Sequence, residues 1–237
     1  MAGARKSLRF GRREVVLGLA SFPLATCVPM RPDKDVSFIP AKQGVTLSPG
    51  DPKRLVELVK LDPSIKLDMR YATTNNFTGR VLYSEARAFL TAAAAQALIR
   101  ASAAAKADGY GLNIYDAYRP WRVTRQLWDA TPAGPKKNYV ANPKRGSKHN
   151  RGCAVDLTLY DLKTGFLVEM PTEFDDFSEK AHRDYSGASP AAIANRVRLQ
   201  NYLESQGFIG LSNEWWHFDF AGWENYPVMD VPFNQIS

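Results

Sequence analysis

Residues 147–160, Ser-Lys-His-Asn-Arg-Gly-Cys-Ala-Val-Asp-Leu-Thr-Leu-Tyr, join a polar loop to a predicted buried strand at 154–160. Two side chains in this stretch, His149 and Asp156, are suited to binding a metal ion. A fully extended chain would hold them roughly 23 Å apart, too far to share an ion. The segment must therefore fold back, and Gly152 has the backbone freedom to allow it. This places Asp156 on the strand and His149 on the loop that leads into it.

The elements around this stretch are mixed, without regular alternation of strand and helix. Alanine-rich or apolar runs with Ser or Pro at their start predict helices over 84–108, 120–128 and 189–207. Alternating or apolar runs between turn residues predict strands over 112–118, 154–160, 166–168 and 215–220. This order favours an α+β fold over a doubly wound one.

Length and composition indicate a single globular domain. The chain has 237 residues, of which 45% are hydrophobic and 23% are charged, so a disordered or fibrous chain is excluded. No apolar run reaches the length of about 18 residues that a membrane-spanning helix needs. With two cysteines, Cys27 and Cys153, a disulfide framework is excluded as well.

Residues 1–26 are predicted to be an export signal. They hold five basic residues and one acid, and the apolar stretch 15–25 follows the pair Arg12-Arg13, which resembles a twin-arginine signal. Five basic residues before this stretch argue against a buried first helix. The stretch ends in Leu24-Ala25-Thr26-Cys27, which resembles a lipobox, so we expect either a lipidated Cys27 that tethers the protein to the membrane or a plain secretory signal. The predicted location is outside the cytoplasm, either periplasmic or membrane-anchored.

The remaining chain divides into an arm and a domain. Prolines are frequent in residues 27–54, which predicts a tether or extended arm, and the folded domain is expected over 55–237. The signal carries +4 of the formal charge of +7 and leaves +3 for the remainder. Nucleic-acid binding is not indicated, because no basic helix or aromatic-basic motif stands out.

A second histidine motif, Glu214-Trp215-Trp216-His217, lies near the C-terminus. Together with His149 and Asp156, His217 completes two imidazoles and one carboxylate, a set that binds catalytic zinc and leaves one position open. These residue types alone also admit other divalent ions. Glu214 would face away from His217 in a regular strand, so it reaches the same site only from a loop or bulge. From there it is suited to act as a general base.

Several motifs in matching order resemble the zinc D-Ala-D-Ala peptidases, and the VanX-type dipeptidase branch most of all. The resemblance covers about residues 55–235. Its motifs are Asp68-Met69-Arg70-Tyr71-Ala72-Thr73, Asp116-Ala117-Tyr118-Arg119-Pro120, Ser147-Lys148-His149, Asp156-Leu157-Thr158-Leu159, Met170-Pro171-Thr172-Glu173-Phe174-Asp175, Phe177-Ser178-Glu179-Lys180-Ala181-His182 and Glu214-Trp215-Trp216-His217-Phe218. The resemblance implies a hedgehog-like peptidase fold, with flanking helices on a mixed or antiparallel sheet.

It also implies roles for individual residues. One Zn²⁺ per chain would be bound by the three residues His149, Asp156 and His217. Glu214 would deprotonate the zinc-bound water, and Arg119 would stabilise the oxyanion as D-Ala-D-Ala is hydrolysed to two D-Ala. Asp175 would receive the substrate ammonium, with Tyr71 and Ser147 lining the pocket.

Other roles are possible for two of these residues, and other functions for the chain. Arg119 could form a surface ion pair, and Asp175 could be a solvated loop charge. The chain could instead be a D,D- or L,D-carboxypeptidase that trims peptidoglycan stem peptides in an open groove. A non-catalytic lipoprotein that binds wall peptides is a third hypothesis, although it predicts a damaged site. The sequence predicts no particular oligomeric state.

Overall fold

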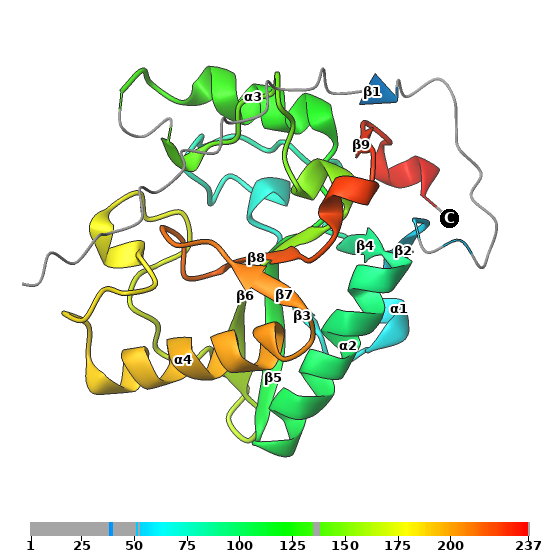
Figure 1. Ribbon diagram of the computed structural model, residues 1–237. Coiled ribbons are helices and arrows are strands. Elements are labelled where there is room, and N and C mark those ends of the chain that lie inside the picture. Colours follow the sequence, from blue (N-terminus) through cyan, green and yellow to red (C-terminus); the bar gives the residue numbers. More distant parts are fainter. Residues whose placement is uncertain (1–37, 40–50, 52, 135–137, 237) are drawn as a thin grey trace, which may run out of the picture. The chain divides into compact units, whose positions relative to one another are not determined.

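The computed structural model (Figure 1) describes residues 38–39, 51, 53–134 and 138–236. All of them belong to one compact unit, Lys34–Ser237. The predicted export signal, the predicted lipidation at Cys27 and most of the 27–54 arm lie outside the described residues.

The central element is a five-stranded sheet in the order β3-β5-β6-β8-β7. Its strands are β3 (Lys66–Leu67), β5 (Tyr110–Asp116), β6 (Ala154–Asp161), β8 (His217–Phe220) and β7 (Phe208–Gly210). The β3–β5 pair is parallel and the other pairs are antiparallel, so the sheet is mixed. The α+β fold with a mixed sheet is therefore confirmed.

Two small strand pairs lie outside this sheet. Strand β2 (Leu55–Glu57) runs antiparallel to β4 (Phe89–Thr91), and the short helix α1 (Leu58–Leu61) follows β2 directly. Strand β1 (Phe38–Ile39) pairs in parallel with β9 (Val228–Met229). A part of the predicted arm is thus extended and bonded to the C-terminal region.

The three longer helices of the described residues are α2 (Ala92–Ala107), α3 (Trp121–Ala130) and α4 (Pro190–Glu204). Helix α4 begins as predicted, because the Ser189 hydroxyl accepts a hydrogen bond from the Ala192 amide and Pro190 takes the first position. In Figure 1, α2 and α4 lie side by side along the sheet, whereas α3 lies at the other end of the molecule.

The predicted start of the helix at residue 84 is wrong. Residues 89–91 form β4, and the helix begins only at Ala92. The run from Phe89 to Thr91 pairs with β2, whose residues lie 32 to 36 positions earlier in the chain, and this long-range pairing outweighs the local helical tendency. Residues 166–168 also form less than the predicted strand, since only Leu167 bridges to Tyr160.

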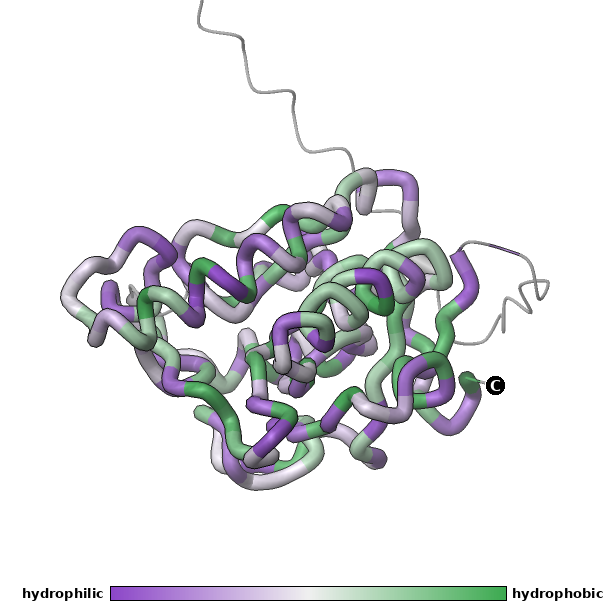
Figure 2. Tube along the Cα trace, turned by 90° about the horizontal axis from the view of Figure 1, so that it is seen from below, coloured by the Kyte–Doolittle hydropathy of each residue, from purple (hydrophilic) through white to green (hydrophobic). Residues whose placement is uncertain are grey.

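Hydrophobic and hydrophilic residues are interleaved along the described chain (Figure 2), so each element can place one side in the interior. Successive side chains of a strand point to opposite faces of the sheet. The buried apolar residues Val155 and Leu157 therefore lie on one face of β6, and Asp156 lies on the other. Among the described residues, no helix combines the length and apolarity needed to span a bilayer.

Candidate active site

Three segments bring His149, Asp156 and His217 together. His149 opens a single 3₁₀ turn (His149–Arg151), which ends at Gly152 with a left-handed φ of 63°. This turn folds the chain back into β6, as expected from the glycine. Asp156 on β6 is the direct register partner of His217 on β8, so the two side chains share one face of the sheet.

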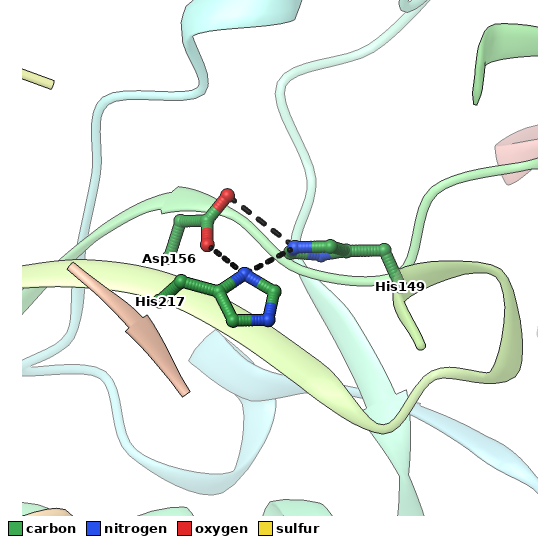
Figure 3. Close-up of side chains that lie close together, drawn as sticks. All are labelled: His149, Asp156 and His217. Carbon is green, nitrogen blue, oxygen red and sulfur yellow. Dashed lines mark hydrogen bonds and ion pairs between the residues drawn. The ribbon is translucent and has the colours of Figure 1, made fainter. Parts of the chain in front are cut away.

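The facing atoms of these three residues lie at close range (Figure 3). The His217 Nδ1 lies 2.9 Å from Asp156 Oδ1, and the His149 Nε2 lies 3.4 Å from Asp156 Oδ2. The two ring nitrogens are 3.2 Å apart. All three residues are buried, and one potential ligand atom from each lies within 4.8 Å of the others.

The opposite nitrogen of each ring is already used. The His149 Nδ1–H donates to the Ala117 carbonyl oxygen at 2.7 Å, and the His217 Nε2–H donates to Asp219 Oδ1 at 2.8 Å. Each imidazole therefore directs its remaining nitrogen at Asp156. Two imidazole nitrogens and a carboxylate oxygen that converge in this way fit a zinc ion.

The charges in this cluster are strongly coupled. Burial alone disfavours the imidazolium, but the hydrogen bonds and charges of Asp156 and Asp219 raise the pKa of His217 to about 10. Burial likewise disfavours the charged form of Asp156, yet the two histidines hold its pKa below the usual value. The cluster thus contains a carboxylate that stays ionised and a histidine whose proton a metal would displace.

Glu214 lies in the turn that precedes β8, as its predicted role requires. From there its Oε2 reaches to 3.9 Å from the His217 Nδ1, on the side of the ring that faces Asp156. Glu214 is buried, and this burial, together with the nearby carboxylate of Asp156, raises its pKa to about 7. A carboxylate with such a pKa can both accept and release a proton near neutral pH.

Arg119 is buried beside the cluster, which excludes the alternative of a surface ion pair. Its Nε and Nη2 donate to Asp116 Oδ2 at 2.8 and 2.6 Å, and Nη2 also lies 4.0 Å from Asp156 Oδ2. The guanidinium carbon lies 5.3 Å from the centre of the Tyr71 ring. Arg119 therefore has a fixed position with its charge directed toward the three facing side chains.

Asp175 and Tyr71 also belong to this group. The Tyr71 hydroxyl donates to Asp175 Oδ2 at 2.9 Å, and Asp175 adopts a left-handed φ of 61°, which is uncommon for a residue other than glycine. Burial and the nearby carboxylates of Asp156 and Glu214 raise the pKa of Asp175 well above its ordinary value. Asp175 is thus not a freely solvated charge, and a cationic ligand would relieve this accumulation of negative charge.

Ser147 differs from the other predicted pocket residues. Its hydroxyl accepts a hydrogen bond from the His149 amide at 3.2 Å. This bond supports the turn that carries His149.

No role was predicted from the sequence for two carboxylates that contact the site, although Asp116 stands in one of the motifs. Asp116 holds Arg119, and Asp219 holds His217. The available signal was spacing. Asp219 lies two residues after His217 on the same strand face, and Asp116 lies three residues before Arg119.

Comparison with known proteins agrees with the family resemblance of the sequence motifs. Residues 51–234 match the family described as D-ala-D-ala dipeptidase. The chain is 37% identical over 184 residues to the D-alanyl-D-alanine dipeptidase of Escherichia coli (strain K12), covering 78% of this chain and 93% of that protein. It is 38% identical over 180 residues to the D-alanyl-D-alanine dipeptidase of Enterococcus faecium, covering 69% of this chain and 89% of that protein.

Proposed function

The chain belongs to the D-Ala-D-Ala dipeptidase family, and we propose that it is a zinc enzyme that hydrolyses the free dipeptide D-Ala-D-Ala to two molecules of D-alanine. The observation that carries this proposal is the convergence of His149, Asp156 and His217, with Glu214 beside them. A general base next to a three-ligand metal site is the arrangement that metal-assisted peptide hydrolysis requires.

The proposed ligands are His149 Nε2, His217 Nδ1 and a carboxylate oxygen of Asp156. When bound by these residues, zinc would supply Lewis acidity, which would lower the pKa of water and polarise the peptide carbonyl. The protein keeps the site in place from outside, because Ala117 and Asp219 bind the outer nitrogens of the two rings.

Glu214 is the proposed general base and acid. Its carboxylate accepts a proton from the attacking water and passes that proton to the amine nitrogen of the leaving D-alanine. Both transfers are feasible near neutral pH because burial raises the pKa of Glu214 to about 7.

Arg119 is proposed to stabilise the negative charge that develops on the carbonyl oxygen. Its guanidinium is oriented before substrate arrives, since Asp116 binds two of its N–H groups. A donor that is fixed in advance needs no reorganisation when the charge develops.

Asp175 is the proposed partner of the substrate's free ammonium, and the Tyr71 hydroxyl holds its carboxylate in position. Asp175 lies near enough to Asp156 for the two charges to interact, and an ammonium held beside the proposed metal ligands favours a substrate of two residues. Ser147 is proposed to line the pocket as well as to support His149.

We also propose that the protein acts outside the cytoplasm. The basic and apolar pattern of residues 1–26 supports export, and Cys27 is the proposed point of lipid attachment. Fractionation of cells that express the full chain, with mass analysis of the mature N-terminus, tests both points. A full-length protein in the cytoplasm would contradict export, and an exported protein with unmodified Cys27 would contradict lipidation alone.

A substrate comparison tests the proposed activity. Zinc-loaded protein should release D-alanine from D-Ala-D-Ala and act poorly on N-acetyl-D-Ala-D-Ala and on stem peptides that end in D-Ala-D-Ala, because these lack the ammonium beside the scissile bond. If the protein cleaved the longer peptides but left free D-Ala-D-Ala uncleaved, it would be a carboxypeptidase instead. Binding of wall peptides without cleavage would indicate a non-catalytic protein.

A further inference from the structure

The outer side of His217 is held by a carboxylate with two partners. Asp219 is buried two residues beyond His217 on β8. Its Oδ1 accepts the His217 Nε2–H at 2.8 Å, and its Oδ2 lies 3.3 Å from the Lys148 Nζ. Because a carboxylate can only accept from the ring, this contact keeps the proton of His217 on Nε2.

Lys148 reaches this carboxylate from the other ligand-bearing segment. It immediately precedes His149, and its Nζ also lies 5.2 Å from the centre of the Trp223 ring. Its carbonyl accepts the Cys153 amide, so its backbone is fixed by the turn that positions His149. The Lys148–Asp219 ion pair thus joins the turn that carries His149 to the strand that carries His217.

The two histidines are held in different ways. His149 presents Nε2 to the site because its Nδ1–H bonds a neutral backbone carbonyl, whereas His217 presents Nδ1 because its Nε2–H bonds a carboxylate. A carboxylate acceptor increases the electron density of the ring and makes it a stronger ligand.

We infer that Asp219 and Lys148 are positioning residues of the zinc site. Asp219 fixes the tautomer and orientation that direct His217 Nδ1 at the metal, and Lys148 holds Asp219 in place while linking the two ligand-bearing segments. This inference rests on the proposed function, since it requires zinc at His149, Asp156 and His217.

The test is the zinc dissociation constant, measured by competition with a chromophoric chelator. Asp219→Ala should weaken zinc binding by about 10- to 100-fold, the range found for groups that orient metal ligands. Lys148→Met should have a smaller effect, because the bond from His217 to Asp219 remains. Asp219→Asn keeps the size of the side chain and one acceptor oxygen, so it should fall between wild type and Asp219→Ala even if the alanine variant folds poorly.

The chain offers a matched control in a second Asp–Lys pair, in which a buried aspartate again meets a half-exposed lysine. Asp62 and Lys106 lie 2.7 Å apart and join α1 to α2, two elements without a proposed ligand. Asp62→Ala and Lys106→Met should lower the thermal stability of the metal-free protein and leave its zinc affinity unchanged.

Wild-type affinity in both Asp219→Ala and Asp219→Asn would overturn the inference. So would an equal loss of affinity in the Asp62 control, because it would reveal a general effect of stability. A wild-type protein that binds no zinc would overturn the proposed metal site itself.

Discussion

Asp156 is a charged residue in the interior of a five-stranded sheet. An unpaired carboxylate there would destabilise the fold, yet Asp156 contacts two imidazoles and has a guanidinium 4.0 Å away. Replacing such a group with an apolar residue is often neutral or stabilising, so fold stability alone does not explain it. Its position is instead accounted for by the metal site that we propose it forms with His149 and His217.

Glu214→Gln tests the general base. The amide cannot accept the proton of water, so turnover should fall by about 10²-fold or more while the zinc content stays near that of wild type. Steady-state release of D-alanine, with zinc measured on the same sample, checks both quantities. Glu224→Gln changes an exposed glutamate and is the control.

The pH dependence of kcat/KM is a second test of Glu214 as the general base. The base must be deprotonated, and a bound dication can only lower its pKa from about 7, so kcat/KM should decline on the acidic side at or below pH 7. Undiminished turnover in Glu214→Gln would remove Glu214 from the mechanism.

Asp175→Asn tests recognition of the ammonium. Loss of one charged hydrogen bond should raise KM for D-Ala-D-Ala by roughly 10- to 100-fold with a smaller change in kcat. The variant should also discriminate less between D-Ala-D-Ala and its N-acetyl derivative. An unchanged KM together with unchanged discrimination would assign Asp175 to loop structure alone.

At the scale of elements, local patterns predicted the core of each element better than its ends. Helix α4 was predicted well because Ser189 and Pro190 mark its start locally. The start of α2 was not, because Phe89–Thr91 is committed to a strand by pairing with Leu55–Glu57, and no nearby residue records that pairing. The turn at Glu214 was not visible in the hydrophobic pattern. It was expected only because Glu214 could not reach the site from a regular strand.

Asp62 links two elements and gives a stability prediction. It accepts hydrogen bonds from Ser102 and Lys106, both on α2. Burial opposes its charge, but these bonds and those from Ser64 hold the pKa of Asp62 well below its ordinary value. Its contribution to stability is therefore complete above the unfolded pKa of about 4 and is lost as the pH falls toward the folded pKa.

Asp62→Asn should accordingly destabilise metal-free protein by about 1–3 kcal/mol at pH 7, and by less at about pH 3. Urea unfolding at the two pH values measures this difference. Asp129→Asn is the control, because its ion pair with Arg125 is exposed and should contribute less than about 1 kcal/mol. A cost for Asp62→Asn that is equal at both pH values would contradict the assigned charge.

At the scale of the whole molecule, the topology of the sheet brings together ligand candidates that lie far apart in the sequence. His217 and Asp156 are 61 residues apart, and antiparallel pairing of β6 with β8 makes them direct neighbours. The three ligand candidates could be chosen from their residue types and from family resemblance. For Asp116 and Asp219 the sequence offered only their spacing from Arg119 and His217, because the role of an aspartate depends on the arginine or imidazole that the fold places against it.

The central claim is that one zinc ion held by His149, Asp156 and His217 supports hydrolysis of D-Ala-D-Ala. The most direct measurement is the rate of D-alanine release as metal-free protein is titrated with zinc. The rate should rise in proportion to added zinc, level off at one equivalent per chain, and stay at baseline throughout for His217→Ala. Release that is independent of zinc, or that His217→Ala matches at one equivalent, would contradict the claim.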